Sequence, residues 1–139
     1  MITWLLDTGP LVASLDAGDP LHPQARAALE TFRGRLSTTG AVVTEAMHFV
    51  SDHPAGPVKL VEFLDKCRVD IWDCFSAASL QQAAQLMRRY ADTPMDFADA
   101  SLVLLAGETG TRDILTFDIR GFRTFRTPHG KPFRLVLDR

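Results

Sequence analysis

Short apolar runs alternate along the chain with longer segments in which apolar residues recur at helical spacing. Short continuous apolar runs indicate buried strands, and the longer periodic segments indicate helices. We predict strands at residues 2–6, 36–39, 69–72, 114–117 and 134–137. We predict helices at residues 11–15, 20–33, 41–53, 58–67, 76–90 and 94–108. This alternation is typical of a parallel or mostly parallel α/β sheet that is covered by helices on both faces.

Two of these helices have an apolar side that we expect to face the core. In the helix at residues 41–53 that side consists of Val42, Val43, Ala46, Met47, Phe49 and Val50. In the helix at residues 76–90 it consists of Ala77, Leu80, Ala84, Met87 and Tyr90. Ser76 is the expected N-cap of the second helix. Residues 52–57 contain two prolines and a glycine and are expected to form a loop.

The last long helix is predicted to carry two carboxylates on one side. Thr93 is its expected N-cap, Pro94 suits the first turn, and Gly110 is expected to end it. Asp96 and Asp99 stand three residues apart, a spacing that places both on the same side of a helix. Helix capping alone would explain Asp96, but Asp99 is expected to lie beyond the capping positions, beside an apolar run. Because an uncompensated carboxylate is costly there, the pair predicts a nearby cation.

Three further carboxylates are expected at the same edge of the sheet. Asp7 follows the first predicted strand, Asp118 follows the fourth, and Glu45 lies near the start of the helix after the second. Strand C-termini and the N-termini of the following helices share one edge of a right-handed α/β sheet, so these acids can meet the helical pair. Oxygen ligands without histidine or cysteine suit Mg²⁺ or Mn²⁺ rather than zinc. An Asx-turn after the strand remains an alternative for Asp7, and a surface position remains one for Glu45.

Chain length and charge indicate the number of domains and the kind of substrate. The 139 residues, 46% of them hydrophobic, suit one domain over residues 1–139 with a sizeable core. The formal charge of −2 is unevenly distributed, because residues 112–139 hold seven basic and three acidic side chains and residues 1–111 carry the excess of acids. A basic C-terminal part could serve a polyanionic substrate, although exposed arginines often form only a solvated face.

Cysteine and histidine usage argues against several other classes of site. Cys67 and Cys74 are too few and wrongly spaced for a zinc site or a secreted disulfide framework. The four histidines, His22, His48, His53 and His129, show no ligand spacing. The apolar N-terminus lacks the basic region of a signal peptide, and no window is apolar enough to span a bilayer. We therefore expect a cytoplasmic protein without a membrane segment.

Four acidic motifs resemble those of a known family. Residues 7–13, 44–46, 95–102 and 115–118 are similar, in order and spacing, to the successive motifs of the PIN-domain family. They resemble in particular those of the VapC-like toxins of bacterial toxin–antitoxin pairs. The resemblance implies a three-layer α/β/α sandwich with a short, mostly parallel central sheet. It also implies a metal-dependent endoribonuclease in which Mg²⁺ or Mn²⁺ polarises the phosphodiester and lowers the pKa of the attacking water.

The resemblance also assigns roles to individual residues. The catalytic and metal-binding acids are then Asp7, Glu45, Asp99 and Asp118. Asp96 matches an accessory acid that adds a further metal ligand. Thr116 matches a hydroxyl that helps to hold the pocket, and Thr8 is a second candidate for that task.

Expected partners follow from the same family. The substrate would be RNA, and Arg120, Arg123 and Arg126 are candidates for contacting its backbone outside the pocket. A small antitoxin would bind the chain and block the site, and the toxin would form a homodimer. The apolar helix sides at residues 41–50 and 58–64 could supply these interfaces, unless they are simply core.

Two other functions are compatible with parts of the pattern. A receiver-like or phosphatase-like protein would phosphorylate an aspartate beside Mg²⁺, but it would need a second acid close to Asp7 and a lysine near a late strand. The only late lysine, Lys131, lies in a loop rich in proline and glycine. A non-catalytic RNA-binding or regulatory module on the same fold is the other alternative, and the intact set of acids argues against it.

Overall fold

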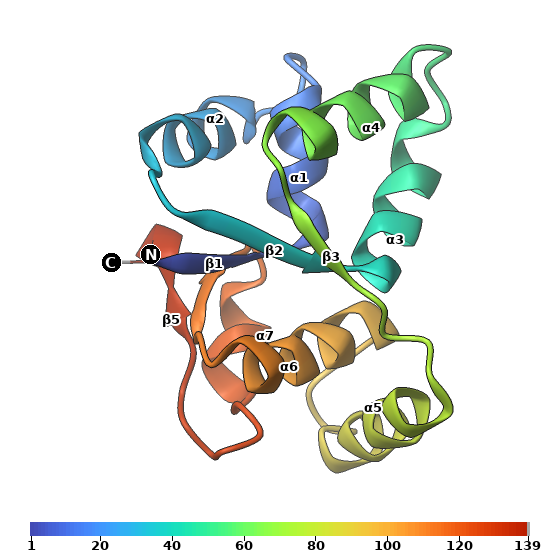
Figure 1. The fold of residues 1–139 in the computed structure, drawn as a ribbon, viewed down its shortest axis with the longest axis vertical. Coiled ribbons are helices and arrows are strands. Elements are labelled where there is room, and N and C mark those ends of the chain that lie inside the picture. The colour runs from blue at the N-terminus through green and yellow to red at the C-terminus, as the bar shows by residue number, and fades with distance from the viewer. Residues whose placement is uncertain (139) are drawn as a thin grey trace.

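A five-stranded parallel sheet forms the centre of the computed structural model, which describes residues 1–138 (Figure 1). Its strands are β1 (Thr3–Leu6), β2 (Arg35–Thr39), β3 (Asp70–Trp72), β4 (Asp113–Leu115) and β5 (Arg134–Leu135). They are ordered β3-β2-β1-β4-β5, and every neighbouring pair is parallel. The predicted parallel sheet is therefore confirmed.

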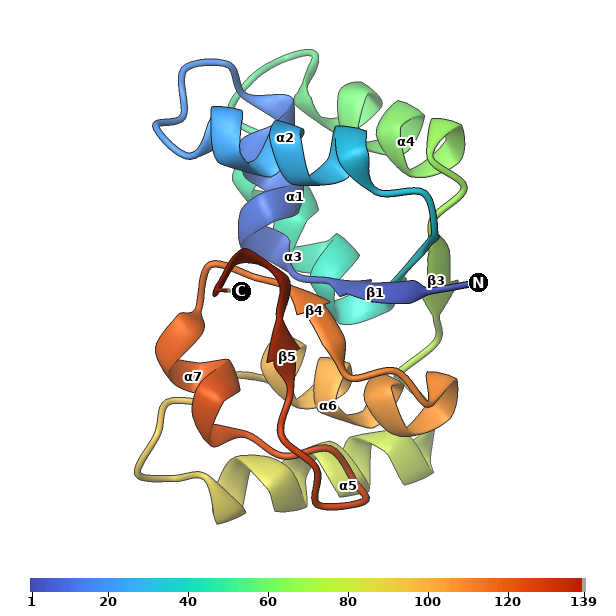
Figure 2. The same ribbon diagram turned by 90° about the vertical axis from the view of Figure 1, so that its left-hand side faces the viewer.

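Helices cover both faces of this sheet. One layer holds α1 (Thr8–Leu15), α2 (His22–Thr31), α3 (Gly40–Val50) and α4 (Gly56–Lys66). The opposite layer holds α5 (Ala77–Arg89), α6 (Phe97–Thr109) and α7 (Ile119–Thr124). Figures 1 and 2 show the sheet between the two layers, which confirms the three-layer arrangement. Within the part of the chain that the structure describes, no helix has the length and hydropathy of a membrane span.

The strand order reverses direction between β1 and β4. From β1 the chain moves outward to β2 and β3, and it then returns to the other side of β1 to form β4 and β5. In open α/β sheets such a switch point leaves a crevice at the carboxyl ends of the two strands, where ligands bind. The amide of Asp7 donates a hydrogen bond of 3.0 Å to the carbonyl of Leu115 at this point. The topology thus predicts a ligand site beside Asp7.

Several element boundaries differ from the sequence prediction. The strand predicted at residues 114–117 ends at Leu115, and the last strand ends at Leu135, where the short 3₁₀ helix of Val136–Asp138 follows. The first helix begins directly after Asp7 rather than at residue 11, because the Asp7 side chain caps it. The loop predicted at residues 52–57 is shorter, since α4 begins at Gly56.

The start of α6 differs from the prediction for the helix at residues 94–108. Asp96, and not Thr93, is the N-cap, so Pro94 lies outside the helix. The Asp96 carboxylate accepts the Asp99 amide at 2.8 Å, and the Asp99 carboxylate accepts the Asp96 amide at 3.1 Å. This reciprocal pair satisfies two amides of the helix end, which favours a start three residues later than predicted. The placement of Asp99 beyond the capping positions was therefore wrong, whereas Gly110, with φ of 74°, ends the helix as expected.

The predicted core side of α5 was also wrong. Leu80 is 44% exposed and Met87 is exposed as well, whereas the buried side chains of this helix are Ser79 and Ala83. The helix packs on α6 and not on the sheet, and its short side chains allow that close approach. In α3 the predicted core side holds except at Phe49, which is 57% exposed. Ser76 caps α5 as predicted.

The burial pattern predicts unequal costs for two leucine truncations. Leu102 in α6 is completely buried, so Leu102→Ala should lower the free energy of unfolding by about 2–5 kcal/mol. Leu80→Ala on the exposed side of α5 should cost less than about 1 kcal/mol. Urea denaturation of the two variants and the parent chain measures both values. Equal losses would show that the side of α5 that carries Leu80 is buried after all.

Candidate active site

Asp7 is a buried carboxylate held at the switch point of the sheet. It follows β1, caps α1, and is only 8% exposed. Its Oδ1 accepts the Thr8 amide at 2.8 Å, and its Oδ2 accepts the Thr116 hydroxyl at 2.6 Å. Since Thr116 follows β4, the second hydrogen bond joins the carboxyl ends of two neighbouring strands. Both carboxylate oxygens therefore have fixed positions.

Burial changes the acidity of this group. Loss of solvent raises the pKa of Asp7 from 3.8 to about 6, while the hydrogen bonds from Thr116 and Thr8 lower it. The negative charges of Glu45 and Asp96 raise the pKa of Asp7 further. Carboxylates from β1, α3 and the start of α6 are thus close enough to repel one another.

Asp99 belongs to the same electrostatic group. Burial raises its pKa from 3.8 to about 8, and the neighbouring charges of Asp96 and Asp7 add to the rise. The hydrogen bond that Asp99 accepts from the Asp96 amide opposes it. The structure therefore brings four of the five predicted acids together in an acidic cluster, namely Asp7, Glu45, Asp96 and Asp99, although their roles in metal binding and catalysis stay predictions.

Asp118 is placed differently from the other four acids. Its carboxylate is exposed and accepts the Gly121 amide at 3.0 Å, so it caps α7. A Cβ atom at residue 121 would lie 2.3 Å from Asp118 Oδ2, so a larger residue there would require the Asp118 side chain to shift. The Asp118 amide donates to Thr116 Oγ1 at 2.9 Å, which links the two residues through the backbone. The carboxylate itself has no described contact with the cluster.

The donor chemistry fits a hard divalent cation. All candidate ligands are oxygen atoms, and their mutual repulsion would be relieved by a positive charge. The Thr8 hydroxyl is buried beside Asp7 without a hydrogen-bond partner among the described residues. A buried hydroxyl in that state normally binds a water or a ligand. Among residues 1–138, however, no three acidic, histidine or cysteine side chains already form a metal-shaped group.

An open hollow adjoins the cluster. It has a volume of about 480 Å³ and is lined by Ala41, Thr44, Glu45, His48, Phe75, Asp96, Phe97 and Ala98. Our sequence reasoning missed Phe75 and Phe97 as part of the site. Phe75 comes three residues after β3, at the same edge of the sheet as the acids, so the rule that located the acids could have located it.

The three candidate arginines differ in their availability. Arg123 pairs with Asp138, and Arg126 Nη1 donates to the carbonyls of Arg123, Thr124 and Phe125. Arg120 is exposed on α7, and its guanidinium has no hydrogen bond or ion pair within residues 1–138. Arg120 is therefore the candidate that can reach a ligand without breaking an existing contact.

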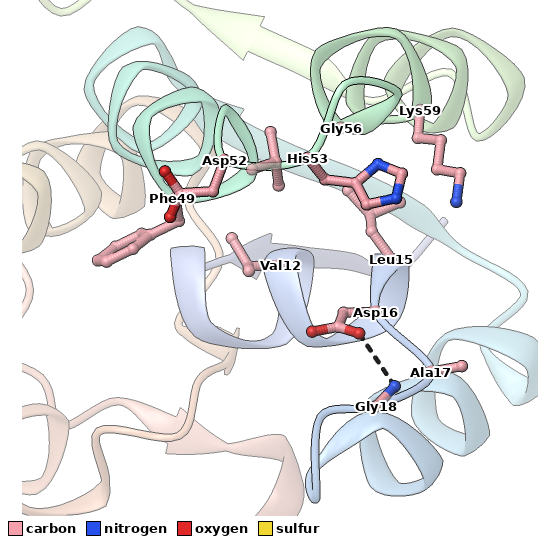
Figure 3. A pocket seen from close by; sticks show the side chains of 11 residues that line it. Val12, Leu15, Asp16, Ala17, Gly18, Phe49, Asp52, His53, Gly56 and Lys59 are labelled. Carbon is pink, nitrogen blue, oxygen red and sulfur yellow. Dashed lines mark hydrogen bonds between the residues drawn. The ribbon is translucent and has the colours of Figure 1, made fainter.

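A second cavity lies away from the acids. It measures about 440 Å³ and lies between α1, α3 and the start of α4, where Figure 3 shows Val12, Phe49 and His53 around it. No member of the acidic cluster lines it. Two other carboxylates line it, Asp16 and Asp52, and Asp16 accepts the Gly18 amide at 2.9 Å. This cavity is therefore separate from the candidate catalytic centre.

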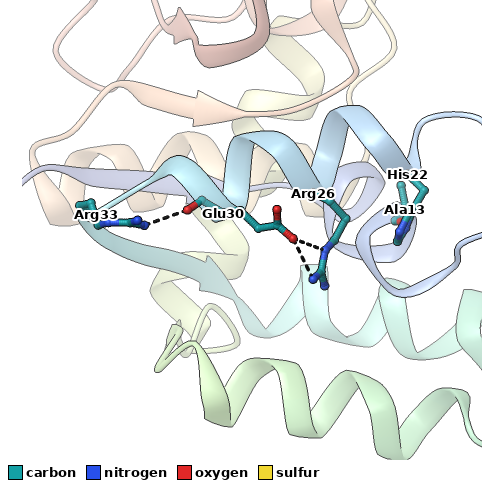
Figure 4. Close-up of polar contacts among 5 residues, drawn as sticks. All are labelled: Ala13, His22, Arg26, Glu30 and Arg33. Carbon is teal, nitrogen blue, oxygen red and sulfur yellow. Dashed lines mark hydrogen bonds and ion pairs between the residues drawn. The ribbon is translucent and has the colours of Figure 1, made fainter.

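Polar groups of α2 make local contacts away from the acidic cluster. His22 Nδ1 lies 2.7 Å from the carbonyl of Ala13, which ties α2 to α1, as Figure 4 shows. Arg26 and Glu30 form an ion pair at 3.0 Å along the exposed side of the helix. His22 is thus used to connect two helices, and not as a metal ligand.

Comparison with known proteins identifies relatives. No family model matches the chain. The chain is 30% identical over 134 residues to Ribonuclease VapC26 of Mycobacterium tuberculosis, covering 95% of this chain and 98% of that protein. Its fold is similar to that of M. tuberculosis VapC20, described as a Sarcin-Ricin loop cleaving toxin. That likeness has a TM-score of 0.76 and 19% identity, over 85% of this chain and 91% of the other.

A further solved structure with this fold is VapBC2 of Rickettsia felis, bound to a DNA fragment from its promoter. The TM-score is 0.65 with 18% identity, over 96% of this chain and 98% of the other. At such identities the two structures support the fold, whereas the 30% identity over almost the full length establishes the family.

The raised pKa values of the buried acids predict how stability depends on pH. Because the native pKa of Asp7 is about 6, folded protein keeps a proton that unfolded protein has already lost. Stability is therefore lost as pH rises from about 4 through 6. In EDTA at about pH 8, Asp7→Asn should be more stable than the parent chain by about 1–3 kcal/mol, and this gain should vanish near pH 4. Denaturant unfolding at both pH values measures it.

Asp65→Asn is the matched control, since Asp65 is an exposed carboxylate on α4. It should leave stability almost unchanged at either pH. A lower stability of Asp7→Asn at about pH 8 would contradict the prediction, because it would mean that the hydrogen bonds to ionised Asp7 outweigh the cost of burying its charge.

Proposed function

This chain belongs to the VapC family of PIN-domain ribonucleases, and from that premise we propose that it is a metal-dependent endoribonuclease, the toxin of a type II toxin–antitoxin pair. The observation that carries the proposal is the acidic cluster at the switch point, where Asp7 is fixed by Thr116 and repelled by neighbouring carboxylates. Such a cluster is unfavourable by itself and becomes favourable with a bound cation.

We assign the metal site to these acids. Asp7, Asp96 and Asp99 would hold Mg²⁺ or Mn²⁺, with Glu45 beside them and Asp118 as a further ligand from α7. When bound, the ion supplies Lewis-acid chemistry, since it polarises a phosphodiester and lowers the pKa of a water. The unpartnered hydroxyl of Thr8 supports a polar occupant at this place.

The side chains of this chain have separate tasks in the proposal. Thr116 and the Thr8 amide orient the Asp7 carboxylate, so its lone pairs face a fixed direction. Asp99 carries a proton near neutral pH in the absence of a cation, because its pKa is about 8. Arg120 would bind a phosphate of the RNA backbone, which its exposure supports. Arg123 and Arg126 would add positive potential while they keep their own contacts.

Partners follow from the family in the same way. A toxin of this class would be inhibited by a small antitoxin and would form a homodimer. Exposed apolar side chains on α3 and α4, namely Phe49, Val58 and Val61, support the presence of protein interfaces there. The RNA substrate and two free cysteines, Cys67 and Cys74, favour the cytoplasm as the place of action.

Cleavage of RNA by purified protein tests the proposal. A mixed structured RNA should be cleaved with Mg²⁺ or Mn²⁺ and left intact with EDTA. Asp7→Asn and Asp99→Asn should each lower the rate by at least about a hundredfold, because even groups that only orient metal ligands contribute tenfold to a hundredfold. Asp65→Asn should retain full activity. Gel electrophoresis of the RNA after timed incubation provides the rates.

Two outcomes would overturn this function. Undiminished cleavage by Asp7→Asn would place the active site elsewhere. Metal binding without cleavage of any RNA would favour the non-catalytic RNA-binding or regulatory module.

A separate measurement tests the metal site without relying on activity. Saturating Mg²⁺ or Mn²⁺ should stabilise the parent chain at neutral pH, by about 2.7 kcal/mol at a metal concentration a hundred times the dissociation constant. Asp7→Asn and Asp99→Asn should lose most of this gain, and Asp65→Asn should keep it. Denaturant unfolding with and without metal measures the difference. An equal gain in Asp7→Asn would exclude Asp7 as a ligand.

A further inference from the structure

An exposed aromatic ring borders the acidic cluster. Phe75, in the loop between β3 and α5, is 51% exposed although its neighbour Cys74 is completely buried. Its ring centroid lies 6.0 Å from that of Phe97, with the two planes tilted by 38°. Phe97 directly follows Asp96, so the two rings and the acids share one edge of the sheet.

The ring of Phe75 packs against neighbouring elements. The Phe75 amide donates to Asp73 Oδ1 at 3.0 Å, which holds the loop in a turn. A Cβ atom on Gly40 would lie 2.5 Å from Phe75 Cε2, so glycine at the start of α3 lets the ring lie directly on that helix. Because the ring already packs against the start of α3, binding a ligand would incur less of the entropic cost of immobilising it.

The ring and the acids line the same hollow. Glu45 and Asp96 contribute carboxylates to this open space of about 480 Å³, and Phe75 and Phe97 contribute aromatic surface. Two carboxylates beside the ring disfavour a purely apolar partner. A nucleic acid suits both the acidic and the aromatic part of the hollow. A cation can link its phosphate to the acids while a base covers the ring.

We propose that Phe75 stacks on an unpaired base of the RNA, next to the phosphodiester held at the acidic cluster. This inference rests on the proposed function and specifies its substrate class. A base inside a duplex already has stacked neighbours on both faces, so only single-stranded or looped RNA offers a free face. Phe75 is then a residue that determines specificity, and the hollow is the subsite for one base.

Fluorescence of 2-aminopurine tests the contact directly. Short single-stranded RNAs with this base at successive positions are titrated with protein in Ca²⁺, which neutralises the acids. One position should be quenched by the parent chain. Phe75→Ala should abolish the quenching and weaken binding by about tenfold, within the range of base–aromatic stacking. Phe75→Trp should restore both, whereas Phe75→Leu, which keeps an apolar side chain without a ring, should not.

Two controls separate stacking from a general surface effect. Leu80→Ala removes an exposed apolar side chain on α5 and should bind RNA like the parent chain. The same RNA annealed to its complement should bind with no dependence on residue 75. Unchanged quenching and affinity in Phe75→Ala would overturn the inference. A change only in oligomeric state, measured by sedimentation, would also overturn it and assign the ring to an interface between copies.

Cleavage of the same RNAs in Mn²⁺ separates this inference from the proposed function. If the parent chain cleaves and Phe75→Ala cleaves equally well, the function stands and the stacking subsite is wrong. If no RNA is cleaved but quenching depends on the ring, the subsite stands and the nuclease assignment is wrong. Loss of about tenfold in kcat/KM for Phe75→Ala, with Phe75→Trp close to the parent, would support both.

Discussion

The structure depends on a hydrogen-bonded carboxyl group, that of Asp7, at the junction of two strands. Asp7 would be costly to bury without partners, and the Thr116 hydroxyl and Thr8 amide supply two hydrogen bonds to its carboxylate. The Asp7 amide donates a hydrogen bond to the Leu115 carbonyl and so joins the same two strands through the backbone. Because β1 and β4 meet at the point where the strand order reverses, this local arrangement also determines where the crevice of the sheet lies.

Several acids of the site also cap helices. Asp7 caps α1, Asp96 caps α6 and Asp118 caps α7, so three helix N-termini point toward the same edge of the sheet. The partial positive charge of each N-terminus makes a carboxylate tolerable there in the absence of a cation. The same amides would compete with a metal for the carboxylate oxygens. Cation binding at these acids would therefore be coupled to the caps of the three helices.

Much of the fold and the acidic edge followed from the sequence, because acids placed directly after apolar strands have few structural alternatives. The errors arose where tertiary contacts decide. Thr93 with Pro94 has a strong local capping signature, yet the reciprocal bonds of Asp96 and Asp99 start the helix later. The six residues of α7 are too few to show a period. Packing against α6 decides which side of α5 is buried. The spacing of apolar residues within α5 itself does not reveal that side.

The acidic and basic parts of the chain both contribute side chains at or near the carboxyl edge of the sheet. Glu45, Asp96 and Asp99 make it acidic, so a polyanion approaches only where a cation or an arginine intervenes. Arg120 stands two residues beyond Asp118 on α7, whereas Phe75 lies on the side of α3 and α6. A strand of RNA across the acids would thus meet a cationic contact from one element and an aromatic contact from another. Phosphate contacts position such a strand, and the aromatic ring selects for an unstacked base.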